Sequence, residues 1–173
     1  FAADRDGKLL FDAVLRGACR LLNPPSALSL QSKATQALIW GLYERGELFD
    51  ERRRAAIARS FLPTYLDRPD DGERYVRKPV LGREGIGVAI LDAGGEEVAR
   101  GERAPRAYGE QPAVFQRYVR APRRRVRRAD GLEIDGEELV TCFVVAGRPS
   151  AVGMRLGGPV TDSSSYFAPV GVR

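Results

Sequence analysis

The spacing of apolar residues changes near residue 72 and divides the chain into a helical part and a strand-rich part. In residues 33–45, apolar side chains recur at the three- and four-residue spacing of an amphipathic helix, and Gly46 provides a stop. Asp50 is placed to cap a second helix over residues 51–61, whose acidic first turn suits the helix dipole. We therefore predict two helices in this part of the chain.

After residue 72 the apolar runs are short and glycines separate them, which is typical of strands joined by turns. Helices lead and strands follow, and this order favours an α+β fold with a mostly antiparallel sheet over alternating parallel units. The predicted strands cover residues 75–80, 87–91, 113–119, 138–146, 151–156 and 167–172.

The start of the sequence carries two further signals. Asn23, Pro24 and Pro25 break any regular element before them and mark a boundary. The first residue is Phe1 and not Met, and a polar stretch follows it. We therefore expect this sequence to be part of a longer protein.

Composition narrows the class of protein. With 173 residues and 43% hydrophobic content, the chain can bury one sizeable core. No apolar run reaches the roughly 18 residues that cross a bilayer, and no signal segment opens the chain, so we expect a cytoplasmic protein without a membrane partner.

The absence of histidine removes the usual general base and zinc ligand, which disfavours most hydrolase mechanisms. Cys19 and Cys142 are not clustered, and we expect both to be buried as small apolar side chains.

The basic residues are almost all arginines. The net charge of +5 and the isoelectric point near 9.6 suit a polyanionic partner, whether a nucleic acid, a nucleotide or an acidic membrane. Of the 28 basic residues only Lys8, Lys33 and Lys78 are lysines. In so arginine-rich a chain, these lysines are candidates for a specific role.

Residues 75–90 form the segment with the clearest chemical pattern. A predicted strand carrying Lys78 leads into a loop with Gly82, Gly85 and Gly87, and a second strand follows. Glycines let backbone N–H groups turn toward an anion and leave room for phosphate oxygens, and Lys78 would add a positive charge. Because a strand and not a helix follows, the loop is neither a Walker loop nor a Rossmann turn. The alternative interpretation is a glycine-rich hairpin with a surface lysine.

Two other segments are candidates for the same site. Lys33 lies at the start of a predicted helix, where the helix dipole disfavours a cation. A bound phosphate would offset that cost, and a solvated lysine is the alternative. Residues 113–119 are strand-like, and such a segment often holds an adenine through its backbone, although an ordinary buried strand has the same pattern.

Taken in order, four segments resemble the C-terminal half of the glutathionylspermidine synthase family. The most specific are the segment that ends in Lys33-Ala34 and the KP-x-x-GREG string from Lys78 to Gly85. Phe115 to Tyr118 and Val152 to Arg155 support the resemblance. The similarity covers most of residues 20–173.

The resemblance implies an ATP-grasp-like α+β fold, with two helices followed by a mostly antiparallel sheet and a glycine-rich lid. In this family ATP phosphorylates a carboxylate, and an amine attacks the acyl phosphate to form an amide. The chain would then be the ATP-binding C-terminal portion of an ATP-dependent carboxylate–amine ligase, with ATP, Mg²⁺ and small carboxylate and amine substrates as partners. The implied regions are a remnant of the preceding region (1–24), a helical part (25–72), the lid and adenine segment (73–121) and a core sheet (122–173).

The same resemblance assigns site residues. Lys33 and Lys78 would contact phosphates or adenine, the loop 82–87 would close over the triphosphate, and Arg155 would act at the γ-phosphate as the catalytic group. The residues assigned to ATP binding are Lys33, Lys78, Gly82, Arg83, Glu84, Gly85, Gly87, Gln116, Arg117, Tyr118 and Val119.

Magnesium ligands are the main departure from the family pattern. In the family they precede the stretch seen here, and we find no equivalent in this sequence. Glu84 and Asp162 are lone carboxylates that we expect to be solvated or to cap turns. We therefore expect the metal ligands upstream, and we expect this chain alone to bind ATP weakly and to catalyse no reaction.

Two other functions remain as alternatives: a nucleotide-binding module without chemistry, and a basic nucleic-acid-binding domain. Residues 123–128 are the densest basic run and could contact nucleic-acid phosphates. Nucleic acid is the less favoured partner, because no aromatic residue interrupts the run and acidic residues follow it. The serines at 163–165 have no histidine to activate them, so we expect a polar loop there.

Overall fold

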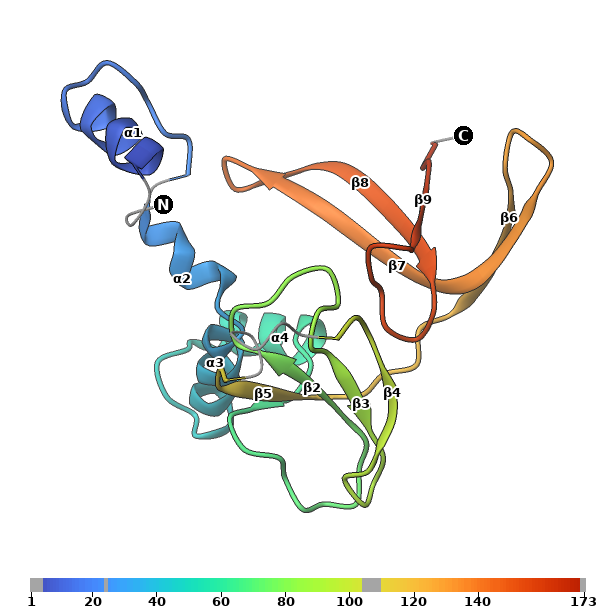
Figure 1. Cartoon of the computed structure of the whole chain (residues 1–173). Helices are drawn as coiled ribbons and strands as arrows, with labels where there is room; N and C mark the ends of the chain where they lie inside the picture. Colours follow the sequence, from blue (N-terminus) through green and yellow to red (C-terminus); the bar gives the residue numbers. More distant parts are fainter. Residues whose placement is uncertain (1–4, 24, 104–109, 172–173) are drawn as a thin grey trace. The chain divides into compact units, whose positions relative to one another are not determined.

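The computed structural model describes residues 5–23, 25–103 and 110–171, and Figure 1 shows its helices and strands. The chain divides into two units, Phe1–Gln31 and Ser32–Arg173. The first unit contains α1 (Arg5–Leu15), the short 3-10 helix η1 (Pro25–Ala27) and α2 (Leu28–Gln31). Gly17 follows α1 with a φ of 73°, the left-handed conformation in which helices commonly end.

Both predicted helices are present in the second unit. They are α3 (Ala34–Glu44) and α4 (Glu51–Ser60), with ends that differ from the prediction by at most one residue. Asp50 caps α4 as expected, because its Oδ1 accepts a hydrogen bond of 2.8 Å from the backbone N–H of Arg53. Gly46 follows α3 with a φ of 73°, as a helix stop requires.

The strands form two antiparallel sheets, and the α+β prediction is confirmed. The first sheet has the order β1-β5-β2-β3-β4, with β1 (Thr64–Tyr65), β2 (Tyr75–Pro79), β3 (Ala89–Leu91), β4 (Glu97–Arg100) and β5 (Ala113–Arg117). The second has the order β6-β7-β8-β9, with β6 (Arg123–Arg127), β7 (Glu133–Val145), β8 (Arg148–Gly157) and β9 (Tyr166–Ala168).

The arginine run is itself a strand, β6, which the sequence did not predict. Its residues face acidic partners across the β6–β7 pairing: Arg125 lies opposite Asp135, and Arg127 lies opposite Glu133. The guanidinium of Arg127 is 3.1 Å from the Glu133 carboxylate. Opposite charges placed directly across a sheet stabilise the pairing, so much of the positive charge of this run is matched within the sheet.

Five of the predicted strands are present as β2, β3, β5, β7 and β8, although β7 begins at Glu133 and not at residue 138. The short strands β1 and β4 were not expected, and the strands form two sheets instead of one. Of the predicted strand at 167–172, only the first two residues are in a strand, as part of β9, and residues 169–171 are not. Val172 lies outside the described residues.

The core of the first sheet forms around buried side chains on neighbouring strands. Tyr75 is fully buried, Val114 is 1% exposed and Ile90 is 3% exposed. The alternation of buried and exposed positions in β2 is the period-two pattern that predicted the strand. In the second sheet, Leu156 is the corresponding buried residue at 1% exposure.

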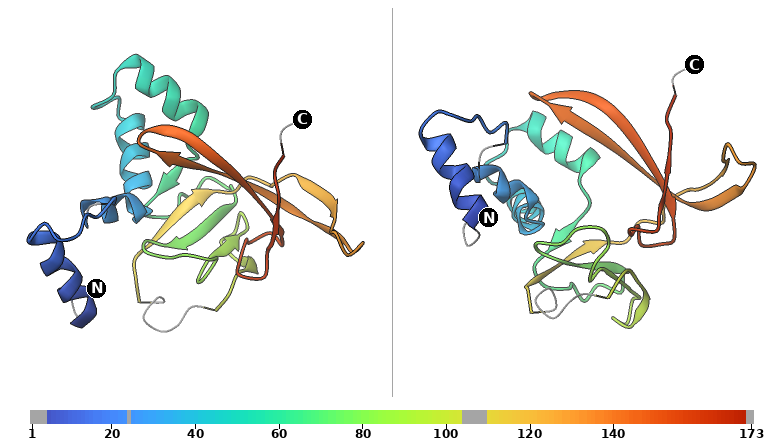
Figure 2. Two further views of the ribbon diagram at one scale, coloured as in Figure 1. Left: turned by 90° about the horizontal axis from the view of Figure 1, so that it is seen from above. Right: turned by 45° about the horizontal axis from the view of Figure 1, so that its top comes forward.

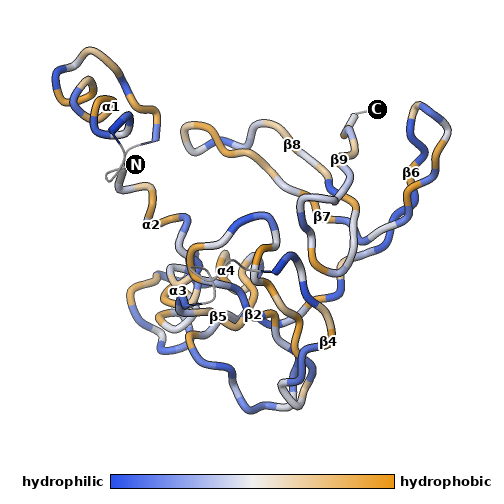
Figure 3. Tube along the Cα trace, in the orientation of Figure 1, coloured by the Kyte–Doolittle hydropathy of each residue, from blue (hydrophilic) through white to orange (hydrophobic). Residues whose placement is uncertain are grey.

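The β7–β8 hairpin is apolar but exposed toward its turn. Figure 2 shows this hairpin from two directions, and Figure 3 shows its hydrophobic colouring. Phe143 is 60% exposed and Val144 is 65% exposed. Cys142 lies here, and both it and Cys19 are exposed, so the prediction that the cysteines are buried is wrong. An apolar sequence pattern indicates a side chain suited to burial, but the surrounding packing decides whether it is covered.

In the part of the chain that the structure describes, no helix combines the length and the apolar character needed to cross a bilayer.

Candidate functional site

A pocket of about 420 Å³ lies against one face of the first sheet. Gln116, Val76 and Ile90 are direct neighbours across β5, β2 and β3, and all three line the pocket. Side chains on directly paired strand positions share a face, so this row forms one continuous wall. The other walls come from the glycine loop, the segment after β5, and residues 137–139 and 158–161.

Lys33 links the start of α3 to the glycine loop. It occupies the N-cap position of α3 without a side-chain cap, and its backbone N–H donates to the carbonyl of Val80 at 3.0 Å. Its Nζ donates to the carbonyl oxygen of Gly82 at 2.7 Å. The side chain is half-buried. The cation at this helix start is therefore held by a loop carbonyl and is not freely solvated.

Lys78 is the second cation of the pocket and extends from β2. Its Nζ donates to Oε1 of Gln116 at 2.6 Å, and both side chains line the pocket. One hydrogen bond uses one of the three protons of an ammonium group. The other two remain for a ligand or for water.

The environment lowers the pKa of both lysines. Desolvation lowers the pKa of Lys33. Desolvation also lowers the pKa of Lys78, and the positive charge of Lys33 adds to this effect. Both causes act against the charged form, and a bound anion would reverse them by supplying the missing opposite charge. The two lysines therefore favour an anionic group, such as a phosphate or a carboxylate, beside them. Three carboxylates, those of Glu84, Glu137 and Glu138, also line the pocket.

The glycine loop between β2 and β3 packs tightly against the segment after β8. Gly85 has a φ of 73°, and a Cβ added to it would lie 2.5 Å from the carbonyl oxygen of Thr161. Glu84, with a φ of 56°, is also left-handed. Only glycine adopts such backbone at little cost and fits in so small a space. Gly85 is thus required both by its conformation and by its neighbour.

The backbone N–H groups in the second half of this loop donate to carbonyl oxygens of the protein and are not free for a ligand. Ile86 donates to the carbonyl of Arg83 at 3.1 Å, Gly87 to that of Glu102 at 2.9 Å, and Val88 to that of Gly85 at 3.1 Å. Residues 82–85 and Val88 line the pocket, whereas Ile86 and Gly87 do not. An anion in the pocket would therefore meet the first half of the loop.

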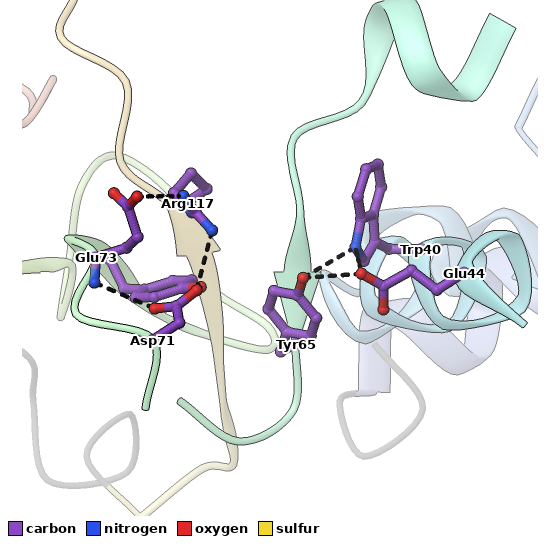
Figure 4. A network of polar contacts seen from close by, with 7 residues as sticks. Trp40, Glu44, Tyr65, Asp71, Glu73 and Arg117 are labelled. Carbon is purple, nitrogen blue, oxygen red and sulfur yellow. Dashed lines mark hydrogen bonds and ion pairs between the residues drawn. The ribbon is translucent and has the colours of Figure 1, made fainter. Parts of the chain in front are cut away.

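Arg117, at the end of β5, is held by acidic residues. Its guanidinium is 3.0 Å from the carboxylate of Asp71 and 3.1 Å from that of Glu73 (Figure 4). The hydroxyl of Tyr75 donates to the same Asp71 carboxylate at 2.8 Å, and burial followed by this hydrogen bond raises the pKa of Tyr75 to about 12. The charge of Arg117 is thus balanced by the protein itself, although the residue lines the pocket.

The structure brings the predicted ATP-binding residues together, with one exception. Lys33, Lys78, residues 82–85 and residues 116–119 all line the pocket, and Gly87 does not. The predicted catalytic residue, Arg155 on β8, is also not among the lining residues. Its guanidinium lies 4.7 Å from the ring centroid of Phe167.

Several lining residues were not predicted. Val76 follows from the alternation of β2 once the face is known, and Ile90 follows from its pairing with Val76. All three residues of β3 are buried, so β3 itself shows no alternation. Residues 137–139 and 158–161 carried no local signal, because they reach the pocket only through tertiary packing. Thr64 was missed as well, although it holds Gln116 through a hydrogen bond of 3.2 Å.

The carboxylates behave largely as turn residues or ion-pair partners. Asp162 accepts hydrogen bonds from the backbone N–H of Ser164 at 2.9 Å and from its hydroxyl at 2.6 Å, which confirms the prediction that Asp162 caps a turn. Glu138 pairs with Arg124. Within the described residues, no group of three or more aspartate, glutamate, cysteine or histidine side chains is placed to hold a metal ion.

The fold and the pocket together define an α+β protein with a lysine-bearing, glycine-lined site suited to an anion. The chain belongs to the family described as "Glutathionylspermidine synthase preATP-grasp", whose profile matches residues 1–173. It is also similar to a protein of Haemophilus influenzae that carries the name "Putative acid--amine ligase", with 27% identity over 156 residues. That match covers 87% of this chain and 34% of the relative, so the chain spans about a third of the relative's length.

Proposed function

We propose that this chain is the ATP-binding portion of a ligase that joins a carboxylic acid to an amine. One observation carries the proposal: three segments that are distant from one another in sequence line one pocket. They are Lys33, the segment that carries Lys78 and residues 82–85, and residues 116–119. The family and the name of the relative support the ligase class. The family description names a preATP-grasp region, so the assignment to the ATP-binding portion rests on the pocket.

Each part of the pocket suits a part of the nucleotide. The ammonium groups of Lys33 and Lys78 match the negative charge of the phosphates. The N–H groups of residues 82–85 can approach phosphate oxygens because no bulky side chain intervenes at the glycines. Val76 and Ile90 offer apolar contact to a base, and the backbone of Val119 offers hydrogen bonds to its edge. The N–H groups of Arg117 and Tyr118 already donate to the carbonyls of Pro63 and Arg74.

The proposed reaction has two steps. A substrate carboxylate attacks the γ-phosphorus of ATP, which forms an acyl phosphate and releases ADP. The amine then attacks the acyl carbon, which forms the amide and releases inorganic phosphate. The proton lost by the amine passes to a base or to water. The guanidinium of Arg155 is assigned to the charge on the transferring phosphoryl group, which requires a closer approach to the pocket than its position over Phe167.

Magnesium is expected in such a reaction, but the described residues do not fit it. They contain no carboxylate cluster placed for a metal ion. We therefore assign the magnesium ligands to the remainder of the longer protein, together with the sites for the acid and the amine. Glutathione and spermidine are the substrates that the family description suggests, and a cytoplasmic location is part of the same proposal.

The three lysines give a direct test of nucleotide binding. Heteronuclear NMR of lysine-labelled protein would report on Lys8, Lys33 and Lys78 separately during an ATP titration. We expect the signals of Lys33 and Lys78 to move and to saturate, while the signal of Lys8, exposed on α1 in the other unit, stays in place. Equal movement of all three signals, or none at Lys78, would refute the proposed function.

A further inference from the structure

Thr64 is a fully buried polar side chain of the first sheet. It is 1% exposed and lies on β1, directly opposite Gln116 of β5. Its hydroxyl donates its single proton to the carbonyl of Leu62 at 2.9 Å. Because a hydroxyl has only one proton, toward Gln116 the Thr64 oxygen acts as an acceptor.

This constraint fixes the orientation of the Gln116 amide. Its Nε2 donates to Thr64 Oγ1 at 3.2 Å and to Oε1 of Gln36 on α3 at 3.4 Å. Its Oε1 accepts from Nζ of Lys78 at 2.6 Å. A rotation of the amide by half a turn would place the NH₂ group against an ammonium and the oxygen against a hydroxyl oxygen. Both contacts would then lack a hydrogen bond, which is costly in a half-buried site.

We propose that Thr64 is a positioning residue of the pocket: its hydroxyl fixes the Gln116 amide so that the amide oxygen holds the Lys78 ammonium toward the ligand. This inference rests on the proposed function for the identity of the ligand. Thr64 itself does not line the pocket and acts through Gln116. Gln36, an exposed residue, supports the same orientation from α3.

A purely structural role for Thr64 makes different predictions from a positioning role. Thr64→Val keeps the shape of the side chain and removes the hydroxyl, whereas Thr64→Ser keeps the hydroxyl and removes the methyl group. If Thr64 only fills space at the sheet edge, the serine variant is affected at least as much as the valine variant. If it positions Gln116, the valine variant alone loses the function of the site.

ATP affinity is the first readout. We expect Thr64→Val to bind ATP about tenfold more weakly, because the Lys78 ammonium loses its fixed acceptor. We expect Thr64→Ser to remain within about twofold of the unmodified chain, since its hydroxyl still accepts from Gln116. Unchanged affinity in Thr64→Val, or an equal loss in both variants, would overturn the positioning role and leave the proposed function intact.

The second readout does not depend on ATP. In lysine-labelled protein without nucleotide, the Lys78 signal should shift in Thr64→Val and stay in place in Thr64→Ser, with Lys8 as the internal reference. If the unmodified chain binds no ATP, the proposed function fails, but this comparison still decides whether Thr64 positions Gln116 and Lys78. A Lys78 signal that is the same in all three proteins would overturn the inference.

The unmodified chain provides a third readout in case Thr64→Val does not fold. The side-chain NH₂ protons of Gln116 should exchange slowly with solvent and show a nuclear Overhauser effect to the methyl group of Thr64. Fast exchange without that contact would show a freely rotating amide, and the inference would then be wrong.

Discussion

Lys33 and Lys78 share one pocket, and the positive charge of Lys33 contributes to the lowered pKa of Lys78. Desolvation is the larger cause for Lys78, and it is the cause for Lys33. Two like charges in a half-buried site cost folding free energy, and an anionic ligand offsets that cost when it binds. Two of the three lysines of the chain therefore lie where a bound anion would stabilise their charge.

Neutralising Lys33 should raise the pKa of Lys78. In Lys33→Met the repulsion from the first ammonium is absent, so the charged form of Lys78 is favoured over a wider pH range. Titration of the Lys78 signal by NMR would measure the change, and Lys8→Met is the matched control because Lys8 lies in the other unit. A pKa of Lys78 that falls or stays constant in Lys33→Met would show that the two charges do not interact.

Stability should fall at high pH because of Tyr75. The folded protein keeps the phenol protonated up to a pKa of about 12, whereas the unfolded chain loses this proton near the ordinary value of 10.0. Between these values the folded state binds more protons, so the free energy of unfolding decreases as the pH rises. Denaturant unfolding of the unmodified chain and of Tyr75→Phe would measure this dependence.

The lysines provide a contrast of opposite sign. Their lowered pKa values mean that, as the pH rises toward 10.5, the unfolded chain keeps protons that the folded chain has lost, so stability rises. Tyr75→Phe should be less stable at neutral pH by about 1 kcal/mol, because the hydrogen bond to Asp71 is lost, and its decline above pH 10 should be smaller. Part of the decline remains, because the raised pKa of Tyr65 acts in the same direction. An identical decline in both proteins would contradict the role of Tyr75.

Gly85→Ala should disturb the loop more than its backbone angle alone explains. A Cβ at Gly85 would meet the carbonyl of Thr161, whereas one at Gly72, which has the same φ of 73°, meets nothing within 4 Å. Gly72→Ala should cost about 1 kcal/mol through the left-handed conformation. We expect a larger loss of stability and a clear loss of ATP affinity in Gly85→Ala only. Equal effects in the two variants would show that the contact with Thr161 is unimportant.

Arg155→Ala should separate binding from turnover. Arg155 stacks on Phe167 and is not among the residues that line the pocket, so we expect the ATP affinity of this chain to stay within about twofold. In the longer protein we expect a fall in kcat of about a hundredfold, because a guanidinium at the transferring phosphoryl group acts in the transition state. Comparison of ATP binding with steady-state turnover checks this. A variant with normal turnover would remove Arg155 from the proposed mechanism.

The local features of the fold could be predicted from the sequence. The helices α3 and α4 follow from apolar spacing and from Asp50, and the glycine loop follows from its composition. β1, with only Thr64 and Tyr65, is too short to produce a pattern. In the sequence, β6 is visible only as a run of positive charges. It was not recognised as a strand because its acidic partners belong to β7, which follows it in the sequence.

The sequence predicted the segments that line the candidate site, but not the contacts that hold these segments together. Lys33, Lys78 and the loop stand out because lysine is rare and glycine is concentrated. Thr161, whose carbonyl leaves no room for a Cβ at Gly85, and Thr64, which holds Gln116, are ordinary residues in the sequence. Their roles arise from contacts between segments far apart in the chain. The exposure of Cys142 shows the same limit, since burial depends on the packing of distant elements.

The most direct test of the proposed ATP site is the affinity of the chain for ATP. Isothermal titration of the unmodified chain, Lys78→Ala and Lys8→Ala compares a pocket lysine with a lysine of the other unit at equal change in net charge. We predict saturable one-to-one binding to the unmodified chain, at least tenfold weaker binding to Lys78→Ala, and unchanged binding to Lys8→Ala. Absence of binding to the unmodified chain, or equal weakening in both variants, would contradict the proposal that this pocket binds ATP.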